Sequence, residues 1–170
     1  MAKRIKKVVV STLIIVGEGA CEKAFLSHLK QLFSNNTDQK VKVDSADGGS
    51  PYDIVNTTVK KIRHIAYDKK YILMDSDIVI DEKTKKLAKE NNIHIIESIP
   101  LCLEGMLLDV LGQTIPSTSI KCKNILYPQL SGSPTDKDSY GSLFTKSLLE
   151  NSNIVSIKEI VSVMKNQLGL

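Results

Sequence analysis

Apolar residues in the first two thirds of this chain alternate between short continuous runs and longer segments of helical spacing. The short runs are rich in β-branched residues, and their length suits strands within a sheet. Four predicted strands lie at residues 8–16, 41–43, 71–74 and 93–96. The first is apolar apart from Ser11 and Thr12, and the alternation at 41–43 indicates a half-buried or edge strand. Apolar residues then recur every three or four positions, which predicts helices at residues 20–33, 52–66, 81–91 and 101–111.

The repeated strand–helix order predicts an α/β fold, with an open, mainly parallel, four-stranded sheet and helices on both faces. We expect its core to span about residues 8–112, followed by a C-terminal extension at residues 113–170. Residues 113–139 are polar and rich in turn-forming residues, so we expect them to be irregular, and such segments are often functional. Residues 140–149 and 154–168 predict two closing helices.

The length of 170 residues suits a single domain over residues 1–170. The 42% hydrophobic and 25% charged residues are ordinary for a globular protein. No apolar run reaches the length of a membrane span, so no membrane partner is expected. The three cysteines are widely spaced and form neither a zinc pattern nor a disulfide framework, which favours a reducing cytoplasm.

A carboxylate follows the first predicted strand. Glu18 lies between Gly17 and Gly19, in the turn that leads to the helix predicted at residues 20–33. Ligands of open α/β sheets bind at such carboxyl ends of strands. An acid at the start of a helix can also be favoured by the helix dipole alone. The sequence leaves both explanations of Glu18 open.

Two more carboxylates, Asp75 and Asp77, follow the strand predicted at residues 71–74. Residues two apart in a strand point to the same side, so both would project together at its carboxyl end. Like charges this close repel unless a cation lies between them, and Mg²⁺ takes such oxygen ligands. Asp-x-Asp alone is common, but together with Glu18 after another buried strand it indicates a divalent-metal site.

Two acids near helix starts are candidates for completing this site. Glu22 lies four residues after Glu18 and could reach the same cation, or it could serve only the helix dipole. Glu104 is an isolated acid near the start of an apolar helix, which is unusual, and Glu97 competes with it for the same role.

Basic residues give a weaker indication. The net charge of +4 permits nucleic-acid binding and does not require it. The basic run at residues 3–7 is either a solvated end or an arm that contacts phosphate. Lys121 and Lys123 are either ordinary surface lysines or residues that steer phosphate toward the metal.

These motifs resemble the Toprim domain, which has a glutamate after its first strand and Asp-x-Asp after its third; residues 16–19 and 75–77 match in that order. The closer resemblance is to the small RloB-like Toprim proteins. Their Gly-Glu-Gly-x-x-Glu motif is matched at residues 17–22, and their Gly-x-x-Pro segment at 48–51. Their Pro-Cys-Phe-Glu-x-Trp-Leu-Leu-like helix start is matched imperfectly at residues 100–108, which are one residue longer and lack both aromatic residues.

The resemblance covers about residues 8–112 and implies a Toprim-like, Rossmann-like fold. It implies a divalent-metal-dependent nuclease that hydrolyses phosphodiester bonds with Mg²⁺ or Mn²⁺. The implied metal ligands are Glu18, Asp75 and Asp77, and the implied catalytic residues are these three together with Glu22 and Glu104.

The resemblance also implies nucleic acid as the substrate, an ATPase as a protein partner and a role in bacterial anti-phage defence, and a homodimer is compatible with it. One alternative is a non-catalytic Toprim-like module that binds nucleic acid or a partner protein. Another is a nucleotide-binding α/β domain whose Gly17–Glu18–Gly19 turn faces phosphate. Glu18 would repel that phosphate unless a metal lay between them, which counts against the second alternative.

Overall fold

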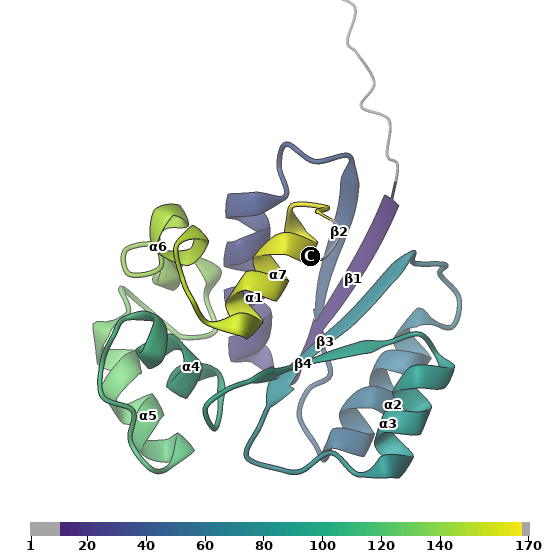
Figure 1. Ribbon diagram of the computed structural model, residues 1–170, viewed down its shortest axis with the longest axis horizontal. Coiled ribbons are helices and arrows are strands. Elements are labelled where there is room, and N and C mark those ends of the chain that lie inside the picture. The colour runs from purple at the N-terminus through teal and green to yellow at the C-terminus, as the bar shows by residue number, and fades with distance from the viewer. Residues whose placement is uncertain (1–10, 168–170) are drawn as a thin grey trace, which may run out of the picture.

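The computed structural model describes residues 11–167. Its centre is a sheet of four strands, β1 (Ser11–Gly17), β2 (Gln39–Ser45), β3 (Lys69–Asp75) and β4 (His94–Ser98). All four are parallel, in the order β2-β1-β3-β4, so β1 and β3 lie in the middle and β2 is an edge strand (Figure 1). The predicted open, parallel α/β sheet is confirmed. Residues 8–10 of the first predicted strand and the basic run at 3–7 lie outside the described residues.

Helices cover both faces of this sheet, as the strand–helix order predicted. On one face lie α2 (Pro51–Ile62) and α3 (Glu82–Glu90), and on the other lie α1 (Ala20–Phe33) and α7 (Val155–Met164) (Figure 1). The remaining helical segments are α4 (Leu103–Val110), α5 (Ser119–Leu126), α6 (Lys146–Glu150) and the 3-10 turns η1 (Tyr127–Gln129) and η2 (Lys137–Tyr140).

The sequence of β1 explains this layered arrangement. Leu13 and Ile15 pack into the core on the α1 face, whereas Ile14 and Val16 pack into the core on the α2 face. All four side chains are completely buried. Successive residues of a strand point to opposite faces, so a central strand is apolar at every position where helices cover both sides.

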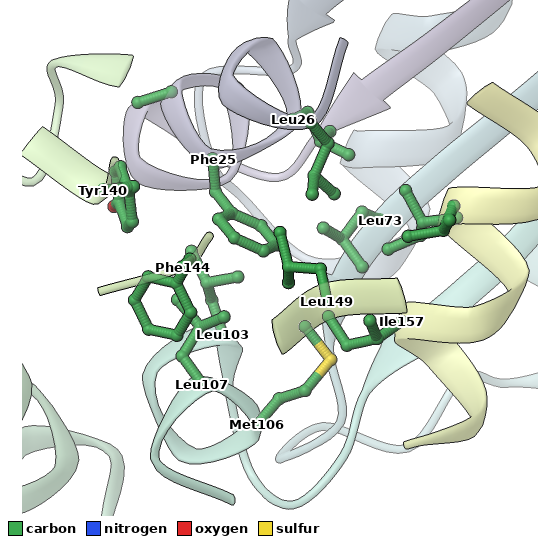
Figure 2. Close-up of a cluster of buried hydrophobic side chains, with 14 of the residues drawn as sticks. Phe25, Leu26, Leu73, Leu103, Met106, Leu107, Tyr140, Phe144, Leu149 and Ile157 are labelled. Atoms are coloured by element: carbon green, nitrogen blue, oxygen red, sulfur yellow. The ribbon is translucent and has the colours of Figure 1, made fainter. Parts of the chain in front are cut away.

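The last third of the chain closes the core on the α1 face. The ring centroid of Phe25 in α1 lies 5.5 Å from that of Tyr140 and 5.9 Å from that of Phe144 (Figure 2). Leu149 and Ile157 belong to the same buried cluster. Residues beyond 112 therefore share one hydrophobic core with the central sheet.

The expectation of an irregular segment at residues 113–139 is wrong, because this segment contains α5. The Thr118 hydroxyl accepts a hydrogen bond from the Lys121 amide at 3.3 Å and caps the helix, while Cys122 and Leu126, one turn apart, are completely buried. The first closing helix is shorter than predicted, since α6 begins only at Lys146. The second closing helix is present as α7, which ends at Met164.

Candidate functional site

Glu18 and Asp75 meet at the carboxyl ends of the two central strands. β1 ends at Gly17 and β3 ends at Asp75, and the two strands are direct neighbours. The Glu18 amide donates to the Leu73 carbonyl at 2.9 Å, and the Asp75 amide donates to Glu18 Oε2 at 3.0 Å. The parallel topology thus brings together two acids that are 57 residues apart, as the sequence predicted.

The start of α4 is attached directly to this pair. Asp75 Oδ1 accepts a hydrogen bond from the Leu103 amide at 3.0 Å. The next residue, Glu104, is in the first turn of α4, and only 1% of its surface is exposed. A Cβ on Gly105 would lie 2.3 Å from the Pro100 carbonyl oxygen, so the absence of a side chain lets this turn pack closely.

Glu22 approaches from the first turn of α1. Its Oε2 accepts a hydrogen bond from the Gly19 amide at 2.8 Å, and its side chain is buried. A Cβ on Gly17 would lie 2.6 Å from Glu22 Cβ, so this glycine allows the helix to begin close to the strand end. Glu22 therefore makes the local contact expected of a first-turn acid and also lies within electrostatic reach of Asp75.

Burial and, after it, mutual repulsion determine the electrostatics of these acids. Burial, followed by the charges of Glu22 and Glu18 and also of Glu104, raises the pKa of Asp75 to about 8, although the Leu103 amide lowers it. Burial, together with Glu104 and Glu18, also raises the pKa of Glu22 above its ordinary value. Within residues 11–167, none of these four carboxylates forms an ion pair. The cluster thus holds negative charge that no basic side chain neutralises at contact distance.

Tyr127, which the sequence did not single out, contacts this cluster. Its hydroxyl donates a short hydrogen bond to Glu104 Oε1 and lies 3.6 Å from the Cys21 sulfur. Burial and the hydrogen bond to Glu104 raise the pKa of the Tyr127 phenol, so it stays protonated and holds Glu104 in place. Tyr127 follows α5 in the stretch expected to be irregular, and no local motif distinguishes it.

Asp77 is placed differently from Asp75. The strand ends at Asp75, and the Ser76 amide and hydroxyl donate to the carbonyls of Leu101 at 3.0 Å and Ser98 at 2.7 Å. The expected two-residue alternation therefore ends at Asp75. Asp77 is exposed, and its Oδ2 accepts a hydrogen bond from the Ser119 hydroxyl at 3.3 Å.

The two candidate lysines differ in their surroundings. Burial lowers the pKa of Lys123, but the negative charges of Glu104, Asp75 and Glu22 outweigh this and raise it. Lys123 is therefore within electrostatic range of the acidic cluster, whereas Lys121 is exposed. Glu97, the competitor of Glu104, is instead among the charges that raise the pKa of Lys85 on α3.

Carboxylate oxygens are the donors that a hard divalent cation takes. Between residues 11 and 167, however, no group of three or more His, Cys, Asp or Glu side chains is arranged so that it could hold a metal ion. Glu104 Oε2 is buried and has no hydrogen-bond partner within this range, which is costly for a carboxylate oxygen. Backbone amides occupy one oxygen each of Glu18, Glu22 and Asp75 and fix their orientation. A cation among these carboxylates would offset both the repulsion and the lack of a partner.

Comparison with known proteins finds no matching family model, and neither a curated protein nor a solved structure shows significant similarity to this chain. None of the described helices combines the length and the apolar character that crossing a membrane requires. The fold and the geometry of the acidic cluster are therefore the features that indicate a function.

Proposed function

We propose that this protein is a Toprim-like, divalent-metal-dependent nuclease that hydrolyses phosphodiester bonds. The observation that supports this proposal best is the convergence of four carboxylates, Glu18, Glu22, Asp75 and Glu104, at the carboxyl edge of the central strands. Their repulsion opposes folding, and such strongly perturbed acids are concentrated at functional sites. An open parallel sheet also binds its ligands at this edge.

Glu18 and Asp75 would hold Mg²⁺ or Mn²⁺, and Asp77 at the rim is the third proposed ligand. A bound ion would supply charge neutralisation and activation of water for attack on phosphorus. The contribution of the protein itself is orientation. The Asp75 amide fixes Glu18, and the Leu103 amide fixes Asp75, so each side chain keeps its second oxygen for another partner. Glu22 and Glu104 would position the attacking water.

Lys123 gives this site a positive group on its α5 side. It has no ion pair within the described residues, although Glu104, Asp75 and Glu22 all act on it electrostatically. We assign to it the neutralisation of a phosphate oxygen of the substrate, with the exposed Lys121 assisting at longer range.

The RloB-like motifs extend this proposal to the cellular role. They suggest bacterial anti-phage defence together with an ATPase partner, and a homodimer is compatible with them. The cysteines at 21, 102 and 122 are free, which agrees with a reducing cytoplasm as the proposed location.

The test is cleavage of labelled single-stranded DNA, duplex DNA and RNA by the purified protein with Mg²⁺ or Mn²⁺. We expect cleavage by wild type and its loss in Asp75→Asn, which removes charge but keeps the acceptor for the Leu103 amide. The matched control is Asp38→Asn, because Asp38 is exposed in the turn between α1 and β2. Cleavage by Asp75→Asn at the wild-type rate would refute the catalytic role.

The alternatives predict other results in the cleavage assay or in thermal melting. A non-catalytic module would bind nucleic acid or a partner and leave every substrate intact, also when the ATPase is added. A nucleotide-binding domain would be stabilised by a nucleotide in the absence of divalent metal, and Asp75→Asn would not reduce that effect.

A further inference from the structure

Three lysines converge on one carboxylate at the β2 side of the acidic cluster. Lys61 of α2 lies 3.4 Å from Asp44 Oδ2, Lys42 of β2 lies 3.8 Å from the same oxygen, and Lys23 of α1 lies 3.9 Å from Oδ1. We call Lys23, Lys42 and Lys61 the basic triad. One carboxylate balances only one of the three positive charges, so the triad has an excess of positive charge.

Asp44 pairs with the triad without neutralising it. Burial raises the pKa of Asp44, but the Ser45 amide, Lys61 and Lys42 together lower it below its ordinary value, so Asp44 stays ionised. The next acid along the chain, Asp47, is exposed and accepts a hydrogen bond from the Ser45 hydroxyl at 3.0 Å.

The basic triad surrounds the edge strand β2, which pairs with the strand that leads to Glu18. Asp44 is in register with Val16, two residues before Glu18, and Lys23 directly follows Glu22. The loop after β2 is attached to the same turn, because the Gly48 amide donates to the Glu18 carbonyl at 2.8 Å. The side chains of Lys23, Lys42 and Lys61 are 50%, 47% and 30% exposed, so solvent and a ligand can reach them.

Stability does not explain the triad. Exposed ion pairs contribute little to folding, and three ammonium groups around one carboxylate also repel one another. A phosphodiester backbone presents negative charges at regular, close spacing, and lysines that neutralise phosphates gain free energy from counterion release. Charge complementarity therefore favours a polyanionic chain as the occupant.

We propose that Lys23, Lys42 and Lys61 bind the phosphodiester backbone of a nucleic acid and hold it beside the acidic cluster. This inference deepens the proposed nuclease function by assigning the contacts that hold the substrate. The chain of phosphates would run from the edge strand β2 across the carboxyl ends of β1 and β3 toward Lys123 on α5.

The test measures binding without cleavage, by fluorescence anisotropy in EDTA, with one sequence prepared as single-stranded DNA, duplex DNA and single-stranded RNA. The variant Lys23→Gln/Lys42→Gln/Lys61→Gln is compared with Lys85→Gln/Lys86→Gln/Lys89→Gln. The control removes the same charge from α3, where Lys85 and Lys86 pair with glutamates of their own helix.

We expect the triad variant to bind at least about tenfold more weakly and to lower the salt slope by about 0.7 to 0.9 for each phosphate that its side chains no longer neutralise. The α3 control should change affinity less than about threefold, because it alters only the net charge. Equal weakening by both variants, or no binding by wild type to any of the three nucleic acids, would overturn the proposal. The substrate form whose affinity falls most identifies the preferred nucleic acid.

A second variant predicts a change of opposite sign. Asp44→Asn removes the carboxylate that competes with phosphate, so it should tighten binding severalfold. Unchanged or weaker binding by Asp44→Asn would show that the three lysines only form ion pairs with Asp44 and do not bind phosphate.

This binding test is independent of the proposed function. Triad-dependent binding without metal-dependent cleavage would support the binding surface and refute the nuclease. Cleavage by the triad variant with an unchanged KM would support the nuclease function and refute the role of the basic triad in substrate binding. Thermal melting of each variant verifies folding, and Lys61→Gln alone replaces the triple variant if that variant is unfolded.

Discussion

Replacing Asp75 by asparagine should stabilise the metal-free protein at alkaline pH. Asparagine keeps an oxygen that can accept the Leu103 amide, so the attachment of α4 to β3 is retained. It removes one charge from a cluster in which Glu22, Glu18 and Glu104 all repel Asp75. The expected gain comes from relieved repulsion and from no longer burying a charged group.

The sign and size of this stability change follow from the pKa of Asp75, which is 3.8 in an unstructured chain and about 8 in the folded protein. Because the folded-state pKa is raised, the stability that protonated Asp75 provides is fully present below pH 3.8 and is lost as pH rises through about 8. The full difference in pKa between the two states corresponds to roughly 6 kcal/mol of the free energy of unfolding. Asp75 is only partly buried, and water screens its neighbours, so we expect about 2 kcal/mol in practice.

The assay is urea unfolding of wild type, Asp75→Asn and Asp38→Asn in EDTA, at about pH 5 and about pH 9. Asp75→Asn should be more stable than wild type at the higher pH, and its advantage should shrink at the lower pH. Mg²⁺ or Mn²⁺ should then stabilise wild type and Asp38→Asn, by about 2.7 kcal/mol at a hundred times Kd, but not Asp75→Asn. An Asp75→Asn protein no more stable than wild type at pH 9 would refute the electrostatic reasoning. Equal stabilisation of all three proteins by metal would refute the metal site.

Two further predictions concern the residues that support the acids. Tyr127→Phe removes the donor to buried Glu104 and should lower the free energy of unfolding by about 1–3 kcal/mol in urea titrations, whereas Tyr67→Phe should have little effect. Gly17→Ala should cost about 2 kcal/mol or more in the same titrations, because its Cβ would lie 2.6 Å from Glu22 Cβ. Gly112→Ala is its control, since Gly112 has φ +68° and no atom near its Cβ position, so its cost should be only about 1 kcal/mol; equal costs at the two glycines would contradict the packing argument.

The sheet could be predicted because its signals are local. β1 is covered on both faces, so its buried positions from Leu13 to Val16 had to be apolar, and its length favoured a strand over a helix. The meeting of Glu18 and Asp75 followed from topology, since parallel neighbouring strands end at the same edge. The sequence therefore predicted both the architecture and the edge at which the acids gather.

What the sequence could not show depends on contacts between distant segments. α5 has few buried side chains, Cys122 and Leu126 among them, so its helical spacing is hidden among lysines and turn-forming residues. Tyr127 bonds to Glu104, which lies 23 residues earlier in the chain, and no local sequence motif predicts that contact. The alternation expected at Asp77 fails because both polar groups of Ser76 bond to other segments, which bend the chain away from the strand.

The sequence separation of the hydrogen bonds that fix the acids leads us to expect that the site forms late in folding. The Glu18–Asp75 contact spans 57 residues, the Asp75–Leu103 contact 28 and the Glu104–Tyr127 contact 23. Contacts of such separation form only after large loops have closed, so the carboxylates stay apart and hydrated while the first helices and strand pairs appear. The carboxylates begin to repel one another only when β3 pairs with β1 and the start of α4 packs against the end of β3. If these carboxylates hold a divalent cation, as proposed, the cation would lower the final barrier, and we expect the last step of refolding to be faster with Mg²⁺ than without it.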